Sequence, residues 1–191
     1  MIYLILYCIS YLCGSVLFGV ITAKFLKIHN LRDRGSGNVG ATNIARVSGK
    51  KTIGILVATL DGLKGAIPIL LSRRLELDEQ SLATVGMMAV LGHIFPIWHC
   101  FKGGKGIAVF IGMNLALDWK IGCIIALIWC FIFLITKISS ISSLVMVFSC
   151  TIAYLWHVDQ LWQIAVCTVI ISIAHRENIK RLLNGSERKI V

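Results

Sequence analysis

The chain has 191 residues, of which 57% are hydrophobic and only 15% are charged, and its mean hydropathy is +0.84. Soluble domains carry about 25% charged residues, so the composition excludes an ordinary soluble protein and predicts one all-α domain, residues 1–191, embedded in a membrane. The formal charge is +10. No basic helix or aromatic platform typical of nucleic-acid binding stands out, so we expect no nucleic-acid partner and assign the cations to loops beside membrane lipid.

Seven apolar segments follow one another along the chain. A helix needs about 20 apolar residues to cross the hydrocarbon. Ile2–Phe25 is long enough and lacks a basic leading region, so we expect a retained helix and not a cleaved signal. The next spans are 53–71, 82–101, the short Ile107–Leu117, 121–135, and the short 144–156 and 161–174. This pattern predicts about seven transmembrane helices, with five full spans and two partial ones as the alternative.

Loop charge predicts which side of the membrane each loop occupies. With seven spans, only Arg73, Arg74 and Lys120 fall on one side, whereas most of the 19 Lys and Arg fall on the other. The acidic residues Glu76, Asp78, Glu79, Asp118 and Asp159 lie with the cation-poor side. Because cytoplasmic loops are enriched in Lys and Arg, we expect the N-terminus outside and the C-terminus in the cytoplasm.

Three polar segments interrupt the apolar sequence, and all fall on the predicted cytoplasmic side. They are Gly35-Ser-Gly-Asn-Val-Gly-Ala-Thr-Asn43, Phe101-Lys-Gly-Gly-Lys-Gly106 and His175-Arg-Glu-Asn178. The first two have the composition of anion-binding loops, in which glycine lets backbone N–H groups converge and Lys or Arg adds charge. The three segments therefore predict one composite site for anionic groups.

The glycine motifs do not indicate a nucleotide fold. Gly35-x-Gly37-x-x-Gly40 matches a dinucleotide fingerprint, but no βαβ unit surrounds it. Lys105 is followed by Gly106 and not by Ser or Thr, so the second loop is no Walker A motif. A flexible connector is the alternative for both loops. Against it stands a density of polar side chains that a connector does not need: Ser36, Asn38, Thr42, Asn43 and Arg46.

Other polar residues are spaced as helical neighbours. His175 and Asn178 share a helix face and predict either a functional pair or an interfacial cap. Glu177 precedes Arg181 by four residues, which favours a structural ion pair. Asp61 and Lys64 lie within the second span, where we favour a structural pair over a functional one. A serine cluster follows Lys137, either as a helix cap or to place a hydroxyl in the site: Ser139, Ser140, Ser142 and Ser143.

The polar segments closely resemble the motifs of the bacterial acyl-phosphate-dependent glycerol-3-phosphate acyltransferase family. The resemblance covers nearly the whole chain through four stretches: Gly35 to Arg46, Gly92-His-Ile-Phe-Pro96 with Phe101 to Ala108, His175 to Gly185, and Leu60-Asp-Gly-Leu-Lys-Gly65. Val109 departs from the family, where many relatives carry Thr. The resemblance implies a seven-helix enzyme of the inner membrane with its active site facing the cytoplasm.

The resemblance also implies the reaction and the residues that perform it. The family transfers a fatty acyl group from acyl phosphate to the first hydroxyl of glycerol 3-phosphate, giving lysophosphatidic acid and phosphate, as the first step of phospholipid synthesis. Matched positions imply glycerol 3-phosphate binding by Arg46, Lys105, Ser143, His175 and Asn178. They imply acyl-phosphate binding by Ser36, Gly37, Asn38, Gly40, Thr42, Asn43, Gly103 and Gly104. Ser36, Arg46, Lys105 and His175 are the expected catalytic residues.

The expected mechanism needs no cofactor or metal. Two phosphate-bearing substrates explain two loops that combine cations with glycine, whose backbone N–H groups we expect to bind the leaving phosphate. A His-x₄-Asp pair is absent, so we expect a substrate phosphate, with a second pKa of about 6, to take the proton. The alternatives are the same transfer from acyl-CoA or acyl carrier protein, and a transporter of a phosphorylated solute.

Overall fold

The computed structural model describes residues 1–189 and contains helices, turns and loops but no strand within that range. It confirms the predicted all-α fold. Ten α-helices are joined by three short 3₁₀ turns, η1 (Leu31–Asp33), η2 (Ile97–His99) and η3 (Tyr154–Trp156). The α-helices are α1 (Ile2–Ser15), α2 (Phe18–Phe25), α3 (Ala41–Ser48), α4 (Lys51–Arg73), α5 (Glu79–Ile94), α6 (Ile107–Leu117), α7 (Trp119–Thr136), α8 (Ser139–Ala153), α9 (Val158–Ala174) and α10 (Arg176–Leu183).

Five helical segments among residues 1–189 are long and apolar enough to cross a membrane: Ile2–Phe25, Lys51–Arg73, Glu79–His99, Trp119–Thr136 and Ser139–Trp156. α9 and α10 add a sixth if they form one span, although they are bent by 60°. α6 has 11 residues, so it rises about 16 Å and covers roughly half of the hydrocarbon thickness. All seven predicted apolar segments are thus helical, and seven full crossings remain a prediction.

Two segments differ in length or continuity from the sequence prediction. The segment expected at 144–156 is longer, because α8 begins at Ser139 and includes the whole serine cluster. The first segment is broken between α1 and α2, where Val16 and Leu17 are extended. The carbonyl of Val16 accepts a hydrogen bond of 2.5 Å from Lys64 Nζ on α4. A buried cation therefore compensates for a backbone group that the break leaves without a helical partner.

Small residues let the central helices approach closely. α1 packs on α5, and α4 packs on α6. A Cβ at Gly14 would lie 2.1 Å from the carbonyl oxygen of Ala89, and one at Gly112 would lie 1.9 Å from the carbonyl oxygen of Gly62. Such contacts between glycine and a neighbouring backbone are typical of packed membrane helices. They fix α1 against α5 and α6 against α4.

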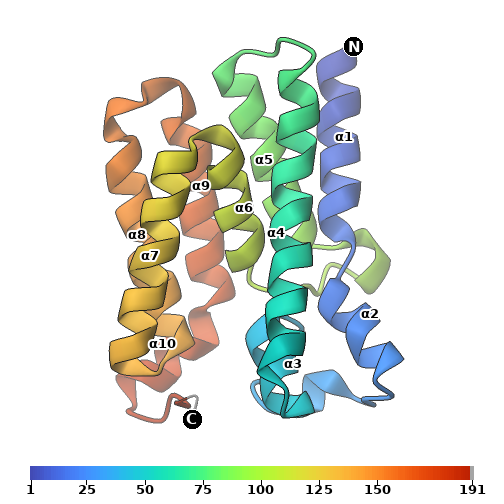
Figure 1. The fold of residues 1–191 in the computed structure, drawn as a ribbon, viewed down its shortest axis with the longest axis vertical. Helices are drawn as coiled ribbons and strands as arrows, with labels where there is room; N and C mark the ends of the chain where they lie inside the picture. The colour runs from blue at the N-terminus through green and yellow to red at the C-terminus, as the bar shows by residue number, and fades with distance from the viewer. Residues whose placement is uncertain (190–191) are drawn as a thin grey trace.

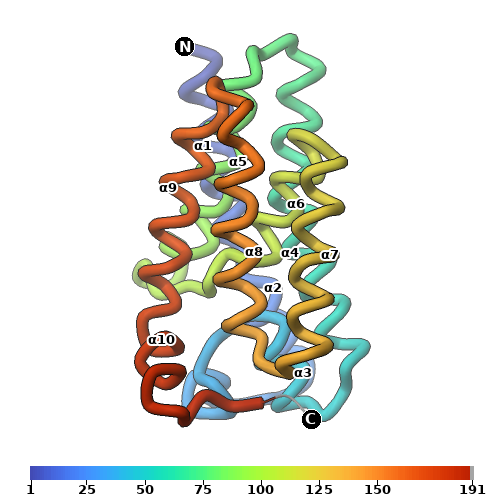
Figure 2. The backbone as a smooth tube through the Cα atoms, turned by 90° about the vertical axis from the view of Figure 1, so that its left-hand side faces the viewer, coloured from blue at the N-terminus to red at the C-terminus, as the bar shows by residue number. Residues whose placement is uncertain are grey.

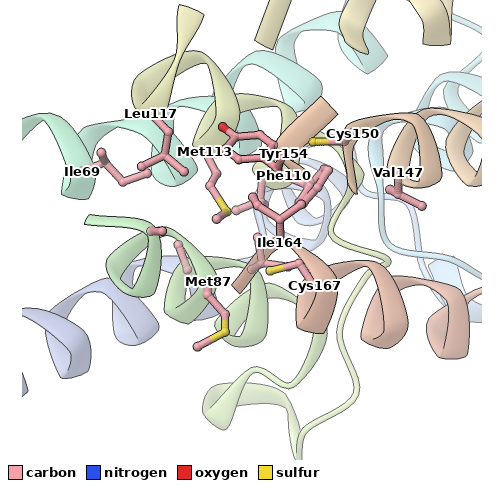
Figure 3. Close-up of a cluster of buried hydrophobic side chains, with 14 of the residues drawn as sticks. Ile69, Met87, Phe110, Met113, Leu117, Val147, Cys150, Tyr154, Ile164 and Cys167 are labelled. Carbon is pink, nitrogen blue, oxygen red and sulfur yellow. The ribbon is translucent and has the colours of Figure 1, made fainter. Parts of the chain in front are cut away.

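The apolar core lies where α5, α6, α8 and α9 meet. Figure 3 shows Phe110 and Met113 of α6 close to Tyr154, Ile164 and Cys167. The other labelled residues belong to the same buried cluster: Ile69, Met87, Leu117, Val147 and Cys150. Large apolar side chains also cover the outside of the bundle, as on α7, where Leu127, Phe131 and Leu134 are exposed. An apolar outer surface is what a lipid environment requires.

The polar segments gather at one end of the bundle. Figure 1 shows the two termini at opposite ends, with α2, α3 and α10 at the end that carries the C-terminus. Figure 2 shows the same grouping from the side, with the segment before α3 and the last turn of α10 close together. A separate cavity of about 450 Å³ is lined by Leu70, Arg73 and residues 115–120. None of these residues belongs to the three polar segments.

Candidate active site

All three polar segments contribute to one cluster of contacts. Lys105 of the second segment donates from Nζ to Oδ1 of Asn178 in the third. Arg188, beyond the third segment, donates to the carbonyl of Gly35 in the first. Arg32 donates to the Lys102 carbonyl at 2.5 Å, which ties the first loop to the second. The structure therefore brings together the segments from which the sequence predicts a composite site.

The first loop is folded by the side chain of Asn43, which is buried at the start of α3. Its Oδ1 accepts from the Ser36 N–H at 2.8 Å, and its Nδ2 donates to the carbonyls of Arg34 and Asn38. Both amide hydrogens of Asn43 are thus used inside the loop. We conclude that Asn43 holds the loop in shape, while Ser36 and Arg46 face the small cavity beside it.

The remaining predicted residues of this loop have distinct local roles. Gly37 adopts φ +76, a left-handed conformation that favours glycine. Gly40 is the N-cap of α3 and makes no side-chain cap, so the first N–H groups of α3 have no side-chain acceptor there. Asn38 Oδ1 accepts from the Val39 N–H at 3.0 Å. Thr42 Oγ1 lies 3.4 Å from Ser139 Oγ on α8 and connects α3 to the serine cluster.

The second loop uses its glycines differently from the sequence expectation. The N–H of Gly103 donates to the carbonyl of Ile94, and that of Gly104 donates to the carbonyl of His93, both at 3.0 Å. These two groups are therefore occupied and do not supply the anion donors predicted for them. A Cβ at Gly103 would lie 1.9 Å from the His93 carbonyl oxygen, so close packing onto the end of α5 explains the glycine.

The helix that follows the second loop has an uncapped N-terminus. Gly106 is its N-cap with φ +81, and no side chain caps α6. Uncapped N–H groups and the helix dipole favour an anion at such a terminus. The loop thus offers Lys105 and the first turn of α6 to an anion, in place of the N–H groups of Gly103 and Gly104.

Lys105 is a partly buried cation in a field of other cations. Its pKa is lowered from 10.5 to about 8, mainly by burial; Glu187 acts against this shift, and Arg181 and Arg46 contribute to it. A lysine in this range is still mainly protonated at neutral pH. Because its pKa is depressed by burial and like charges, an incoming phosphate would relieve both the repulsion and the lack of a full counter-ion.

His175 lies at the bend between α9 and α10, beyond the end of the α9 span. Its Nδ1 is 2.8 Å from the carbonyl oxygen of Ile171. A carbonyl only accepts, so Nδ1 carries the proton and Nε2 is left as an acceptor. Burial, with a smaller contribution from the charge of Lys105, lowers the pKa of His175 to about 4. His175 is therefore a neutral imidazole at physiological pH.

Glu187 belongs to this cluster, although the sequence analysis does not identify it. Its carboxylate accepts hydrogen bonds from Asn178 at 2.6 Å, Arg181 at 2.7 Å and Ser140 at 2.8 Å. Burial alone would raise the pKa of Glu187. The hydrogen bonds together lower this pKa by more than burial raises it, so the net shift is downward. The sequence signal was a single acid in a basic C-terminal segment, two residues after Gly185.

The side chains around Glu187 form an anion-binding environment. A cavity of about 80 Å³ is lined by Gly35, Ser36, Arg46, Arg181, Glu187 and Arg188. Three of these residues are arginines, whose guanidinium groups suit phosphate and carboxylate oxygens. One carboxylate already lies among them, which demonstrates that the geometry accommodates an oxyanion.

The predicted ion pair between Glu177 and Arg181 does not form. Arg181 pairs with Glu187 and not with Glu177, which lies near Lys180 at 3.5 Å and Arg176 at 3.7 Å on the exposed face of α10. Glu177 and Arg181 do lie on one helix, but the segment after α10 folds back, and its Glu187 is the closer partner for Arg181.

Within the serine cluster, Ser140 is the residue that contacts Glu187. Ser143, one turn further along α8, donates to the Ser139 carbonyl at 2.8 Å and accepts from Trp129 at 3.1 Å. Its predicted contact with glycerol 3-phosphate stays a prediction. Among residues 1–189, no three His, Cys, Asp or Glu side chains converge as metal ligands do.

The whole chain is similar to a known family of enzymes. The family model described as "Glycerol-3-phosphate acyltransferase" matches residues 4–185. Relatives with that name are 38% identical in Ruthia magnifica, covering 100% of this chain and 98% of theirs, and 40% identical in Bradyrhizobium diazoefficiens, covering 95% and 92%. A third, in Thermotoga petrophila, is 39% identical over 95% of this chain and 93% of its own.

Solved structures lead to the same family. The crystal structure of PlsY (YgiH), an integral membrane glycerol 3-phosphate acyltransferase, in its glycerol 3-phosphate form, matches with a TM-score of 0.93 and 39% identity, covering 100% of this chain and 96% of that one. Its lysophosphatidic acid form matches with a TM-score of 0.91 and 38% identity over the same shares. With the matched sequence, the membrane-type bundle and the polar cluster at one end, the chain belongs to the glycerol-3-phosphate acyltransferase family of integral membrane proteins.

Proposed function

We propose that this protein transfers a fatty acyl group from acyl phosphate to the sn-1 hydroxyl of glycerol 3-phosphate, at the cytoplasmic face of the inner membrane. The observation that carries the proposal is the contact of Lys105 with Asn178, beside buried His175 and a cluster of arginines, at one end of an apolar bundle. Such an arrangement suits a soluble phosphate ester that meets a lipid-borne partner.

The charges fit two phosphate-bearing substrates. Lys105, Arg46, Arg181 and Arg188 surround a single carboxylate, that of Glu187. Two anions held side by side repel each other, so a surplus of fixed cations lowers the cost of binding both. The uncapped first turns of α3 and α6 add two partial positive charges at the same end.

The chemistry balances without a cofactor. The sn-1 hydroxyl oxygen of glycerol 3-phosphate forms a bond to the acyl carbon, while the bond from that carbon to the phosphate oxygen breaks. The hydroxyl proton passes to the released phosphate, and the products are lysophosphatidic acid and inorganic phosphate. The protein contributes orientation and charge stabilisation, which are large terms in enzymatic acyl transfer.

His175 supports this choice of proton acceptor. Its Nε2 can accept a hydrogen bond from the substrate hydroxyl because Nδ1–H is held by Ile171. With a pKa of about 4, it is a weaker base than a phosphate, whose second pKa is about 6. We assign His175 to orienting the hydroxyl, and the phosphate to accepting the proton.

A donor assay separates the candidate functions. Purified full-length protein in detergent is given glycerol 3-phosphate with palmitoyl phosphate, palmitoyl-CoA or palmitoyl acyl carrier protein, and lysophosphatidic acid is measured. Product from palmitoyl phosphate alone is expected. Product from palmitoyl-CoA but not from palmitoyl phosphate would overturn the donor, and uptake of glycerol 3-phosphate into proteoliposomes without product would support a transporter.

A matched pair of variants controls that assay. Lys105→Met removes a cation of the site, whereas Glu177→Gln alters an exposed charge on α10 that forms ion pairs with Arg176 and Lys180. Activity should disappear in the first variant and persist in the second. Equal activity in both would show that the product does not come from this site.

A further inference from the structure

A buried chain of three ionisable side chains lies against the second loop. Asp61 and Lys64 belong to α4, and His93 belongs to the last turn of α5. No more than 4% of any of the three residues is exposed. Lys64 Nζ is 2.8 Å from Asp61 Oδ1 and 2.8 Å from His93 Nδ1. Buried ionisable groups in a membrane protein are costly and commonly serve function.

The hydrogen bonds of Lys64 determine where His93 carries its proton. An ammonium group has three N–H donors and accepts nothing. Lys64 directs two of them to the Val16 carbonyl at 2.5 Å and to His93 Nδ1, and its Nζ forms an ion pair with Asp61 Oδ1 at 2.8 Å. Nδ1 is therefore an acceptor, and a neutral imidazole with that arrangement holds its proton on Nε2.

The Nε2 side of His93 faces the glycine loop. A Cβ at Gly104 would lie 2.2 Å from Nε2, so only glycine leaves room for the imidazole edge at that position. The backbone of the same loop cannot replace this donor, because the N–H groups of Gly103 and Gly104 already donate to Ile94 and His93 carbonyls. His93 thus presents a side-chain N–H where the loop's own N–H groups are occupied.

This donor has no partner in the protein. Within the described part of the chain, His93 Nε2 makes no hydrogen bond, although only 4% of the residue is exposed. Nε2 is not among the fully enclosed polar atoms without a partner, so it keeps access to the space beside the loop. Most polar atoms of buried residues are hydrogen-bonded, so a free donor on a nearly enclosed side chain is available to a ligand. Gly104, against which Nε2 packs, directly precedes Lys105, and Lys105 bonds to Asn178, so the donor lies next in the chain to the lysine of the anion-binding cluster.

We infer that His93 is a further substrate-binding residue, whose Nε2–H donates to a phosphoryl oxygen of the acyl phosphate, and that Lys64 and Asp61 are positioning residues that keep the proton on this nitrogen. The inference rests on the proposed acyl-phosphate donor. As the bond between the acyl carbon and the phosphate oxygen breaks, negative charge grows on the phosphate, and the hydrogen bond strengthens. His93 gives up no proton.

Nitrogen-15 NMR of full-length protein in micelles tests the proton position. The His93 resonances are those lost in His93→Gln. Wild-type protein should show a protonated Nε2 and an unprotonated Nδ1, and Lys64→Met should give a mixture of tautomers. A proton on Nδ1 in the wild type would overturn the inference.

Kinetics and binding test the contact with the donor. His93→Leu removes the N–H and should lower kcat/KM for palmitoyl phosphate about 100-fold, while the KM for glycerol 3-phosphate changes less than about threefold. His93→Gln keeps an N–H near Nε2 and should return to within about tenfold of wild type. Gln163→Leu, which removes a buried amide bonded to Gln80 and Thr84, is the control and should leave the donor kinetics unchanged.

A non-hydrolysable probe covers the case in which His93→Leu does not fold. Palmitoyl phosphonate should shift the Nε2–H proton resonance of wild-type His93 downfield, and an unchanged resonance in the bound protein would overturn the inference. The two proposals fail differently. Wild type without activity on palmitoyl phosphate sinks the proposed donor, whereas wild type with that activity and a folded, equally active His93→Leu sinks only the role of His93.

Discussion

Two buried polar clusters lie near one end of the bundle, and they are built in opposite ways. In the closed cluster, Asp61, Lys64 and His93, the ammonium group of Lys64 is fully engaged inside the protein, by hydrogen bonds to the Val16 carbonyl and His93 Nδ1 and by an ion pair with Asp61. In the open cluster, around Lys105 and Asn178, Lys105 makes one side-chain hydrogen bond within residues 1–189. The number of donors left over distinguishes a lysine that holds the protein together from one that can bind a ligand.

Charge separates the clusters as well. The closed cluster pairs one cation with one carboxylate across 2.8 Å. The open cluster gathers several cations around Glu187, and their mutual repulsion contributes to the lowered pKa of Lys105. A membrane protein tolerates a neutral buried pair as structure, whereas a surplus of partly buried cations is typical of a site that binds an anion.

The largest expected effect comes from emptying the open cluster. Lys105→Met should lower kcat/KM about 10³-fold, because the site loses the cation that contacts Asn178. Lys102→Met is the control, since the exposed Lys102 side chain lies in the same loop. The measurement is lysophosphatidic acid formation by purified protein. A comparable loss in both variants would attribute the effect to the loop and not to the Lys105 charge.

Breaking the closed cluster should cost stability. Asp61→Ala leaves Lys64 buried without its counter-ion and should lower the free energy of unfolding by about 3–5 kcal/mol. The double variant Asp61→Leu with Lys64→Met replaces the pair by apolar side chains and should recover most of this loss. Unfolding in mixed micelles gives both values. A double variant that is less stable than Asp61→Ala would contradict the neutral-pair description.

His175→Gln tests the base in the open cluster. A substrate phosphate as proton acceptor predicts measurable residual activity, lower by about 10–100-fold, because only the orientation of the hydroxyl is weakened. Steady-state rates and calorimetric binding of glycerol 3-phosphate are measured together. Complete loss of activity with intact binding would identify His175 as the base instead.

The pH dependence of kcat/KM should follow the charge of Lys105, with an effect of about tenfold per pH unit. Lys105 has its pKa lowered from 10.5 to about 8, so its charged form prevails below pH 8 and is lost as the pH rises above it. We expect kcat/KM for glycerol 3-phosphate to fall by about tenfold per pH unit beyond that point. Lys105→Arg stays protonated and should remove the decline between pH 8 and 9. A decline that persists in Lys105→Arg would assign it to another group.

The smallest effects are expected at the edge of the open cluster. Ser140→Ala removes a hydrogen bond to Glu187 and should raise the KM for glycerol 3-phosphate about threefold. Ser143→Ala should change it less than about twofold, because the Ser143 hydroxyl is bonded to Ser139 and Trp129. A larger effect at Ser143 than at Ser140 would favour the contact that the sequence motif predicts.

Much of the architecture could be predicted from the sequence because its signals are local. Apolar runs identify all seven helical segments, and the spacing of Gly, Lys, His and Asn identifies the polar segments that meet at one end. The break at Val16 was not predicted, since its compensating donor, Lys64, is 48 positions away. Glycines in the second loop were recognised, but their N–H groups were expected to be free.

The sequence by itself determined an all-helical membrane chain, its polar segments and the cations they carry, because hydropathy and side-chain chemistry are properties of each residue and its near neighbours. The tertiary structure alone decided that Glu187 folds back onto Asn178, that Arg181 pairs with Glu187 and not with Glu177, and that Lys64 lies 2.8 Å from His93 Nδ1. These contacts depend on where separate helices end in space, and no local pattern encodes that position.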